Sequence, residues 1–134
     1  MARQPTSLPP TAMRSQLGRV RGLGSAGSGV EIWWAERVTS IALVPLSIWF
    51  IVAVIAHLGA DRAAIARWIG QPVNTVLLLA LVIATFRHMA LGLQAVIEDY
   101  VHGELARMVS LLVMRGAAWV LGLASVVAVV KLAF

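Results

Sequence analysis

Three long apolar runs constrain what this chain can fold into. They cover residues 38–58, 73–97 and 108–134, and the connections at 59–72 and 98–107 are short. A helix rises about 1.5 Å per residue, so each run is long enough to cross the roughly 30 Å of hydrocarbon in a bilayer. Hydrophobic residues make up 60% of the chain and charged residues only 13%. We therefore expect an all-α membrane protein with three transmembrane helices.

The charges around the first run predict its orientation. Arg19 and Arg21 precede this run, and Arg37 stands at its entrance. The positive-inside rule keeps such segments in the cytoplasm, so the amino terminus is expected there. Three crossings then place the carboxyl terminus in the periplasm. We expect a cytoplasmic, mostly flexible segment over residues 1–32 and a three-helix membrane anchor domain over residues 33–134.

Several other classes of function are disfavoured by residue type and context. The chain has no cysteine, which excludes a thiolate-bound iron–sulfur cluster within it. Residues 22–27 spell GxGxxG, but no strand precedes them, so a flexible segment is favoured over a nucleotide site. The net charge of +5 comes without a basic helix or interleaved aromatic residues, so no nucleic-acid partner is expected. An organellar transit peptide is the alternative for this arginine-bearing start, but Pro5, Pro9 and Pro10 interrupt it.

The second apolar run carries a stripe of small and polar residues. At about 100° per residue, His88, Gly92, Ala95 and Asp99 fall on one side of the helix. The glycine and the alanine leave a flat recess beside the imidazole. An axial haem ligand needs such a recess, because the porphyrin lies close to the helix while the nitrogen reaches the iron. A histidine hydrogen-bonded inside a helical bundle, with small residues permitting close packing, is the alternative.

Polar side chains gather at the cytoplasmic end of the same helix. Asp99 and Tyr100 lie there, with Asp99 about 16 Å along the axis from His88. A phenol and a carboxylate can hydrogen-bond and deliver protons to a quinone carbonyl, although both are also ordinary at a membrane interface. Arg37, at the same face of the membrane, can pair with a haem propionate or a quinone anion. Arg87 can pair with a propionate or with a partner's carboxylate, or it can snorkel.

Two further histidines are expected to lie outside the site. His57 and His102 fall at helix ends near water, where an unliganded histidine costs little. A bis-histidine haem site within this chain is therefore not expected, and a second axial ligand would come from another subunit. No nucleophile with an adjacent base and no phosphate-binding loop supports catalysis by this chain alone.

Taken in order, these motifs resemble those of a known family. HMALGLQ at residues 88–94, followed by EDYV at residues 98–101, is similar to the H-x-x-x-G-x-Q…D-Y signature of the smaller hydrophobic membrane anchor of succinate dehydrogenase. That enzyme is succinate:quinone oxidoreductase, or respiratory complex II. Residues 17–26, 33–39 and 42–46 resemble segments of the alphaproteobacterial anchors. The resemblance covers nearly the whole chain from residue 17 onward.

The resemblance implies a role within a larger complex. In this family two anchor subunits of three helices each hold a flavoprotein and an iron–sulfur protein at the cytoplasmic face of the membrane. The second anchor is a cytochrome b556-type subunit, and the two anchors share a b-type haem with one histidine from each. Ubiquinone binds near the iron–sulfur subunit and receives its electrons. FAD and the iron–sulfur clusters belong to the partners, so the anchor is a non-catalytic, multi-pass subunit of the bacterial inner membrane that serves the respiratory chain and the tricarboxylic acid cycle.

The resemblance also implies residue roles. It makes His88 the axial ligand of the haem iron and Tyr100 the hydrogen-bond donor to quinone, with Asp99 beside it. Arg37 matches the arginine near the propionates and the quinone, whereas Arg87 stands where some relatives have an apolar residue. The family includes fumarate reductase anchors, some without haem. The alternatives are therefore a haem-free structural anchor, or a proton-relay or transporter subunit that uses Arg87, His88 and Asp99.

Overall fold

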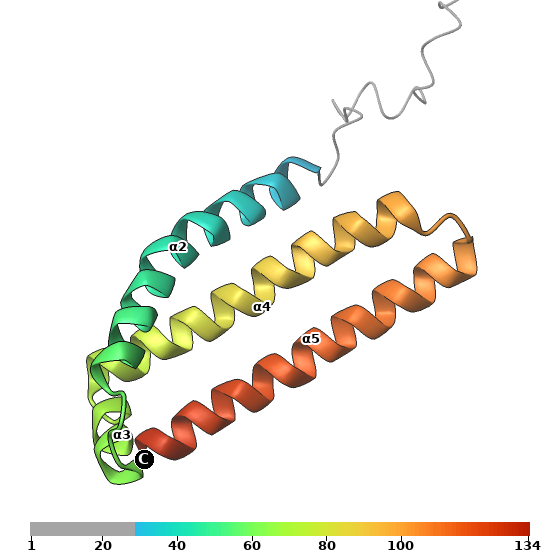
Figure 1. Ribbon diagram of the computed structural model, residues 1–134. Coiled ribbons are helices and arrows are strands. Elements are labelled where there is room, and N and C mark those ends of the chain that lie inside the picture. The colour runs from blue at the N-terminus through green and yellow to red at the C-terminus, as the bar shows by residue number, and fades with distance from the viewer. Residues whose placement is uncertain (1–28) are drawn as a thin grey trace, which may run out of the picture. The chain divides into compact units, whose positions relative to one another are not determined.

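The computed structural model describes residues 29–134, which contain four helices (Figure 1). These are α2 (Gly29–Ala56), α3 (Arg62–Ile69), α4 (Pro72–Tyr100) and α5 (Glu104–Ala133). Of these, α2, α4 and α5 are long and apolar enough to cross a membrane. The predicted all-α membrane fold with three transmembrane helices is confirmed. The GxGxxG segment and the family-like residues 17–26 lie outside the described residues, as does most of the predicted amino-terminal segment 1–32.

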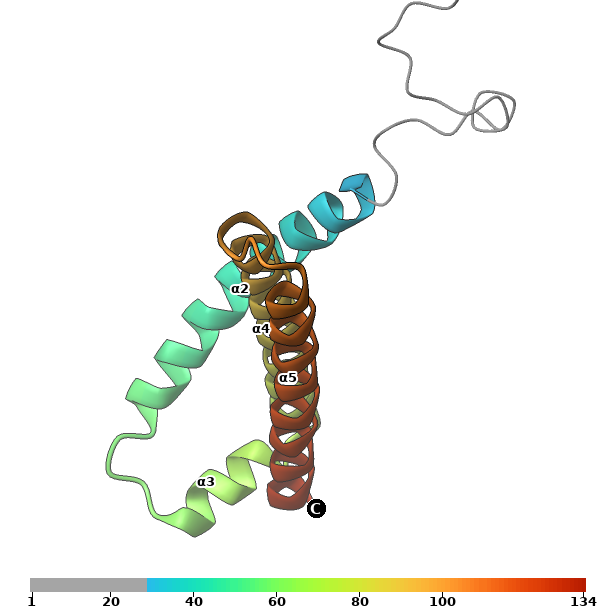
Figure 2. The same cartoon turned by 90° about the vertical axis from the view of Figure 1, so that its right-hand side faces the viewer.

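The helices α4 and α5 form an antiparallel hairpin (Figures 1 and 2). Pro72 opens α4, where its missing N–H leaves no helical hydrogen bond unmade. Small residues bring the two helices together, because Ala118 is buried and Gly122 lies directly against Phe86. A methyl group built on Gly122 would lie 3.3 Å from Cγ of Phe86. Close approach through small residues is the usual way in which transmembrane helices associate.

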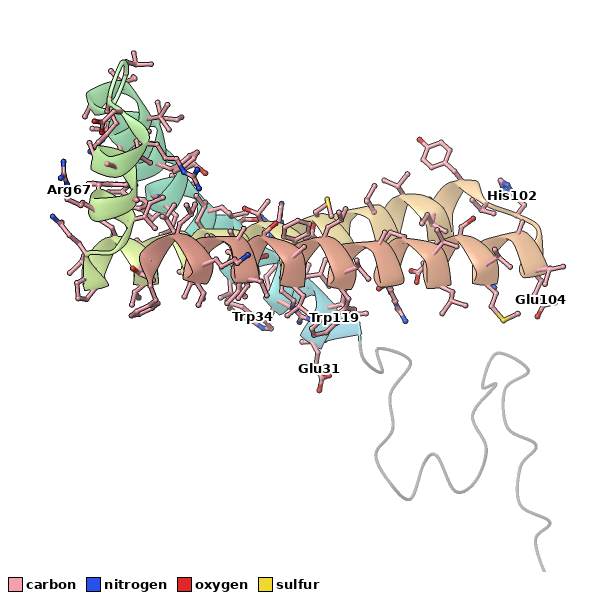
Figure 3. The ribbon with its side chains drawn as sticks, turned by 90° about the horizontal axis from the view of Figure 1, so that it is seen from below. Glu31, Trp34, Arg67, His102, Glu104 and Trp119 are labelled. Carbon is pink, nitrogen blue, oxygen red and sulfur yellow. The ribbon has the colours of Figure 1, made fainter. Side chains whose placement is uncertain are left out.

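The short helix α3 was not predicted from the sequence, which indicated only a connection at residues 59–72. Asp61 starts it, because its side chain accepts a hydrogen bond from the backbone N–H of Ala64 at 2.7 Å. The eight residues of α3 have an amphipathic pattern and include Arg67, which projects from the molecule in Figure 3. A run this short and this polar falls below the length and hydrophobicity that mark a membrane span.

Buried polar side chains at the start of α4 hold α3 in place. The amide of Asn74 donates to the backbone carbonyl of Trp68 at 2.8 Å, and the hydroxyl of Thr75 donates to that of Ile69. These carbonyls lie at the end of α3, where no further helical turn can satisfy them. Gly70 then packs against the end of α5, and a Cβ built on it would lie 3.1 Å from the carbonyl oxygen of Ala133. The connection between α2 and α4 is therefore an ordered part of the fold.

The first long helix packs less closely than the other two. No residue of α2 is buried, and in Figure 2 the helix leans away from α4 and α5 toward α3. Trp49 stacks on Trp68 of α3, with ring centroids 5.7 Å apart. Figure 1 shows that α2 is bowed, and Pro45 lies inside it. Proline removes a helical hydrogen bond, which accounts for the bend. Most of the surface of α2 is therefore available to lipid or to another subunit.

Candidate functional site

His88 lies in the middle of α4 and contacts α2. Its Nδ1 atom is 3.1 Å from the hydroxyl of Thr39 and 3.5 Å from the hydroxyl of Ser40. In the part of the chain that the structure describes, these are the polar side-chain contacts between α2 and α4. The ring is partly buried. With Nδ1 hydrogen-bonded to α2, the second ring nitrogen, Nε2, is the atom left for a ligand.

Sequence reasoning missed Thr39 and Ser40. Both hydroxyls also bond to their own helix, with Thr39 Oγ1 2.8 Å from the carbonyl oxygen of Ala35 and Ser40 Oγ 2.8 Å from that of Glu36. One signal was present in the sequence. The two hydroxyl residues stand about as many residues from the start of α2 as His88 stands from the end of α4, so two antiparallel membrane-spanning helices place them at a similar depth.

The surface of α4 is open at Gly92, where the sequence predicts a recess beside His88. Gly92 lies one helical turn after His88, and a Cβ built on it meets no atom within 4 Å. An imidazole held through one nitrogen, beside open space one turn away, fits the needs of an axial haem ligand. Within residues 29–134 no three or more histidine, cysteine or acidic side chains gather as a metal-binding group. A haem does not need such a group, because the porphyrin supplies the equatorial nitrogens itself.

Arg37 lies on a different side of α2 from Thr39. It precedes Thr39 by two residues, which is about 200° around the helix. Its guanidinium carbon lies 5.3 Å from the ring centroid of Trp33, over the face of the indole, and the side chain is exposed. Thr39 and Ser40, rather than Arg37, are the residues of α2 whose polar groups contact His88. The role of Arg37 at a propionate or a quinone stays a prediction.

Asp99 and Tyr100 lie together at the end of α4, and both are exposed. Tyr100 has 78% of its surface accessible. The α4–α5 turn follows, and Figure 3 shows His102 and Glu104 there, at the opposite end of the helical hairpin from Arg67. Neither Asp99 nor Tyr100 is hydrogen-bonded to His88, which is consistent with the predicted axial separation. Their polar groups are free to meet a molecule bound at this end.

A polar chain near the same end links α4 to α5. Arg115 donates a hydrogen bond to the side-chain oxygen of Gln94 at 3.0 Å, and the amide of Gln94 donates to Glu98 at 2.9 Å. Sequence reasoning assigned no role to Arg115. The available signal was an arginine inside the third apolar run, since a charge at such a position needs a partner. This chain of hydrogen bonds joins the two helices at an exposed part of the hairpin.

Arg87 and His88 are neighbours in sequence but face different helices. Arg87 lines a cavity of about 430 Å³ between α4 and α5, and other residues that line it are Phe86, Gln94, Arg115 and Trp119. His88 instead contacts α2. The rest of the cavity lining is mostly apolar, so the side chains of Arg87 and Arg115 lie among apolar side chains. The roles predicted for Arg87, which are pairing with a propionate, pairing with a partner's carboxylate and snorkelling, stay predictions.

The chain is similar in sequence to known membrane anchors. A family model described as "Succinate dehydrogenase/Fumarate reductase transmembrane subunit" matches residues 11–131. The succinate dehydrogenase hydrophobic membrane anchor subunit of Rickettsia bellii is 36% identical over 88 residues, which is 66% of this chain and 70% of the relative. The corresponding subunit of Paracoccus denitrificans is 30% identical over 82 residues, covering 61% of this chain and 64% of the relative. No solved structure matches the chain significantly.

Proposed function

This chain belongs to the succinate dehydrogenase/fumarate reductase transmembrane subunit family, and we propose that it supplies one axial ligand to a b-type haem and part of a ubiquinone site. It is a membrane anchor subunit of succinate dehydrogenase, with three helices that cross the membrane. In this role it carries no catalytic centre of its own. It holds the partners that oxidise succinate and helps electrons from the iron–sulfur subunit to reach quinone.

The position of His88 carries the haem proposal. Its Nδ1 is hydrogen-bonded to α2 at 3.1 Å, and a Cβ on Gly92, one turn along α4, would meet open space. The partner anchor would supply the second axial ligand, because His57 follows the end of α2 and lies about 27 Å along that helix from Thr39, which contacts His88. The Nδ1 atom of His57 lies 2.8 Å from the carbonyl oxygen of Ala53, and its ring packs on Trp68. A haem held there would supply one-electron transfer, and His88 would tune its potential through the donor strength of the imidazole.

The exposed end of α4 supports the quinone proposal. The phenol of Tyr100 would donate a hydrogen bond to a quinone carbonyl oxygen, and the carboxylate of Asp99 would pass protons from water to the reduced oxygens. Two electrons from the iron–sulfur partner and two protons from water convert the quinone to the quinol. Arg37 would stabilise the anionic form that appears between the two transfers. These groups act only if this end of α4 faces the cytoplasmic subunits.

The assembly follows from family membership and is part of the proposal. A second hydrophobic anchor, an iron–sulfur subunit and a flavoprotein would join this chain in a bacterial inner membrane. FAD and the iron–sulfur clusters would be held by those partners. The exposed apolar surface of α2, which buries no residue in the single chain, supports packing against such a partner anchor.

Haem spectra of the whole complex test the proposal. The complex is purified in detergent through a tag on this chain, and the dithionite-reduced minus oxidised spectrum is compared for wild type, His88→Ala and His102→Ala. We expect a b-type signal in wild type and in His102→Ala, because His102 is exposed on the turn after α4. We expect its loss in His88→Ala while the flavin and iron–sulfur subunits still co-purify. A wild-type complex without haem would reduce His88 to a packing or proton-transfer residue.

A further inference from the structure

We propose that Thr39 is the positioning residue that holds the imidazole of His88 in its Nδ1–H tautomer, with Ser40 as a second acceptor. The inference rests on the proposed role of His88 as a haem ligand. It goes beyond that role because it names the groups, on a different helix, that set which ring nitrogen carries the proton. Thr39 and His88 stand 49 positions apart in the chain, and the fold brings their side chains into contact.

The first step is the position of the hydroxyl groups. Thr39 Oγ1 lies 3.1 Å from Nδ1 of His88, and Ser40 Oγ lies 3.5 Å from the same atom. The closer contact is a well-formed hydrogen bond, whereas the longer one lies at the limit of hydrogen-bond distance. Thr39 is therefore the principal partner, and Ser40 stands beside it with the same chemistry.

The second step is the direction of the hydrogen bond. A hydroxyl has one proton to donate and lone pairs to accept with. Thr39 lies 2.8 Å from the carbonyl oxygen of Ala35, and Ser40 lies 2.8 Å from that of Glu36. A carbonyl oxygen can only accept, so each hydroxyl that donates to its own helix presents a lone pair to the ring. Nδ1 then carries the proton and donates it.

The third step is the consequence for the ligand. A neutral imidazole carries one N–H, so a proton on Nδ1 leaves the lone pair of Nε2 free to bind iron. The hydrogen bond from the other ring nitrogen also fixes the orientation of a metal-bound histidine and raises its basicity. A more basic ligand favours the ferric over the ferrous haem. The hydroxyl of Thr39 should therefore lower the midpoint potential of the haem and strengthen its retention.

The experiment removes the hydroxyls without changing the ring. We compare Thr39→Val, Ser40→Ala and the double variant in the purified complex, with Thr39→Ser as the variant that keeps a hydroxyl. The haem midpoint potential is measured by redox titration, and haem affinity by transfer to an excess of a scavenging apoprotein. We expect a higher potential in Thr39→Val and a larger shift in the double variant. Loss of such an outer partner lowers metal affinity about 10- to 100-fold, so haem transfer should rise accordingly.

A matched control separates this role from a general effect of lost hydroxyls. Ser125 on α5 makes the same bond to the carbonyl oxygen four residues before it, at 2.8 Å, so Ser125→Ala should leave the potential and the haem affinity unchanged. Thr39→Ser keeps a hydroxyl, so its haem midpoint potential and haem affinity should equal those of wild type. If Thr39→Val does not assemble, Thr39→Ala removes the same hydroxyl without adding bulk.

The outcomes distinguish this proposal from the one on which it rests. A wild-type complex without haem would overturn both proposals. A haem that is lost in His88→Ala, but keeps its potential and affinity in the double variant, would overturn the role of Thr39 alone. A Thr39→Ser complex that behaves like Thr39→Val would also overturn it, because the effect would then come from the packing of the methyl group.

Discussion

At the scale of single residues, Tyr100 has two candidate roles, which are a contact with quinone and that of an ordinary aromatic residue of the membrane interface. The residue is 78% exposed, so removal of the hydroxyl should leave the stability of the chain nearly unchanged. In Tyr100→Phe we expect the haem spectrum and succinate oxidation by artificial acceptors to stay at wild-type values. Ubiquinone reduction should fall about tenfold or more, the effect of one lost hydrogen bond to the reacting molecule. Steady-state quinone kinetics measure the change.

Trp119 provides the control for Tyr100. It is 77% exposed and lies on α5 rather than at the end of α4, so Trp119→Phe changes another accessible aromatic side chain. We expect normal quinone kinetics in this variant. Unchanged kinetics in Tyr100→Phe would assign the tyrosine to the headgroup layer, where such rings are common. A similar loss in both variants would indicate a general disturbance of the membrane interface.

The residues predicted from the sequence share a feature that the missed residues lack. His88 and Gly92 stand one turn apart on one helix, so the helical period alone brings them to one side. Thr39 belongs to another helix, 49 residues away, and no period within either helix reports a contact between them. Arg115 was missed for a similar reason, since its partner Gln94 lies 21 residues away on α4. The candidate ligand His88 could be proposed from the sequence, whereas its contacts on other helices required the fold.

At the scale of helices, the α4–α5 hairpin depends on close contact at Gly122. A side chain there would press on Phe86, since even a Cβ would lie 3.3 Å from Cγ of that ring. Overpacking of this kind costs about 1–3 kcal/mol, so Gly122→Val should lower the thermal midpoint of the purified complex. Gly116→Val is the matched control, because Gly116 also lies in α5 but a Cβ there meets open space.

The comparison between these two variants removes the effect of helix propensity. Valine replaces glycine within the same helix in both, so the intrinsic change in helix stability is shared. We expect the Gly122→Val complex to unfold at a lower temperature than the Gly116→Val complex. Equal midpoints would show that Phe86 moves aside freely and that the hairpin does not depend on this contact. A lower midpoint in Gly116→Val alone would place an intersubunit contact at Gly116 instead.

The three spans were predictable because length and hydrophobicity suffice to identify a transmembrane helix. The structure extends them, since α2 begins at Gly29 and α4 continues to Tyr100. The helix α3 was not predictable in this way. It has eight residues, and hydrogen bonds from Asn74 and Thr75 at the start of the next helix hold its end. Tertiary contacts, rather than a periodic apolar pattern, define it.

At the scale of the whole molecule, the two ends of the hairpin must face opposite sides of the membrane. Figure 3 shows Arg67 of α3 near one end and His102 near the other. Arg19, Arg21 and Arg37 predict a cytoplasmic amino terminus. Arg62 and Arg67 then lie on the periplasmic side, so the charge difference between the two sides is moderate. Orientation is therefore the property of the fold that most needs a direct measurement.

The absence of cysteine from the sequence makes that measurement direct. Ala63→Cys places a single thiol on exposed α3, and His102→Cys places one on the exposed α4–α5 turn. In cells with a permeabilised outer membrane, a membrane-impermeant maleimide should label Ala63→Cys. It should label His102→Cys only after the inner membrane is dissolved. The reverse pattern would turn Tyr100 and Asp99 away from the cytoplasmic subunits. In the proposed function electrons reach quinone from those subunits, so that result would also contradict the proposed quinone site.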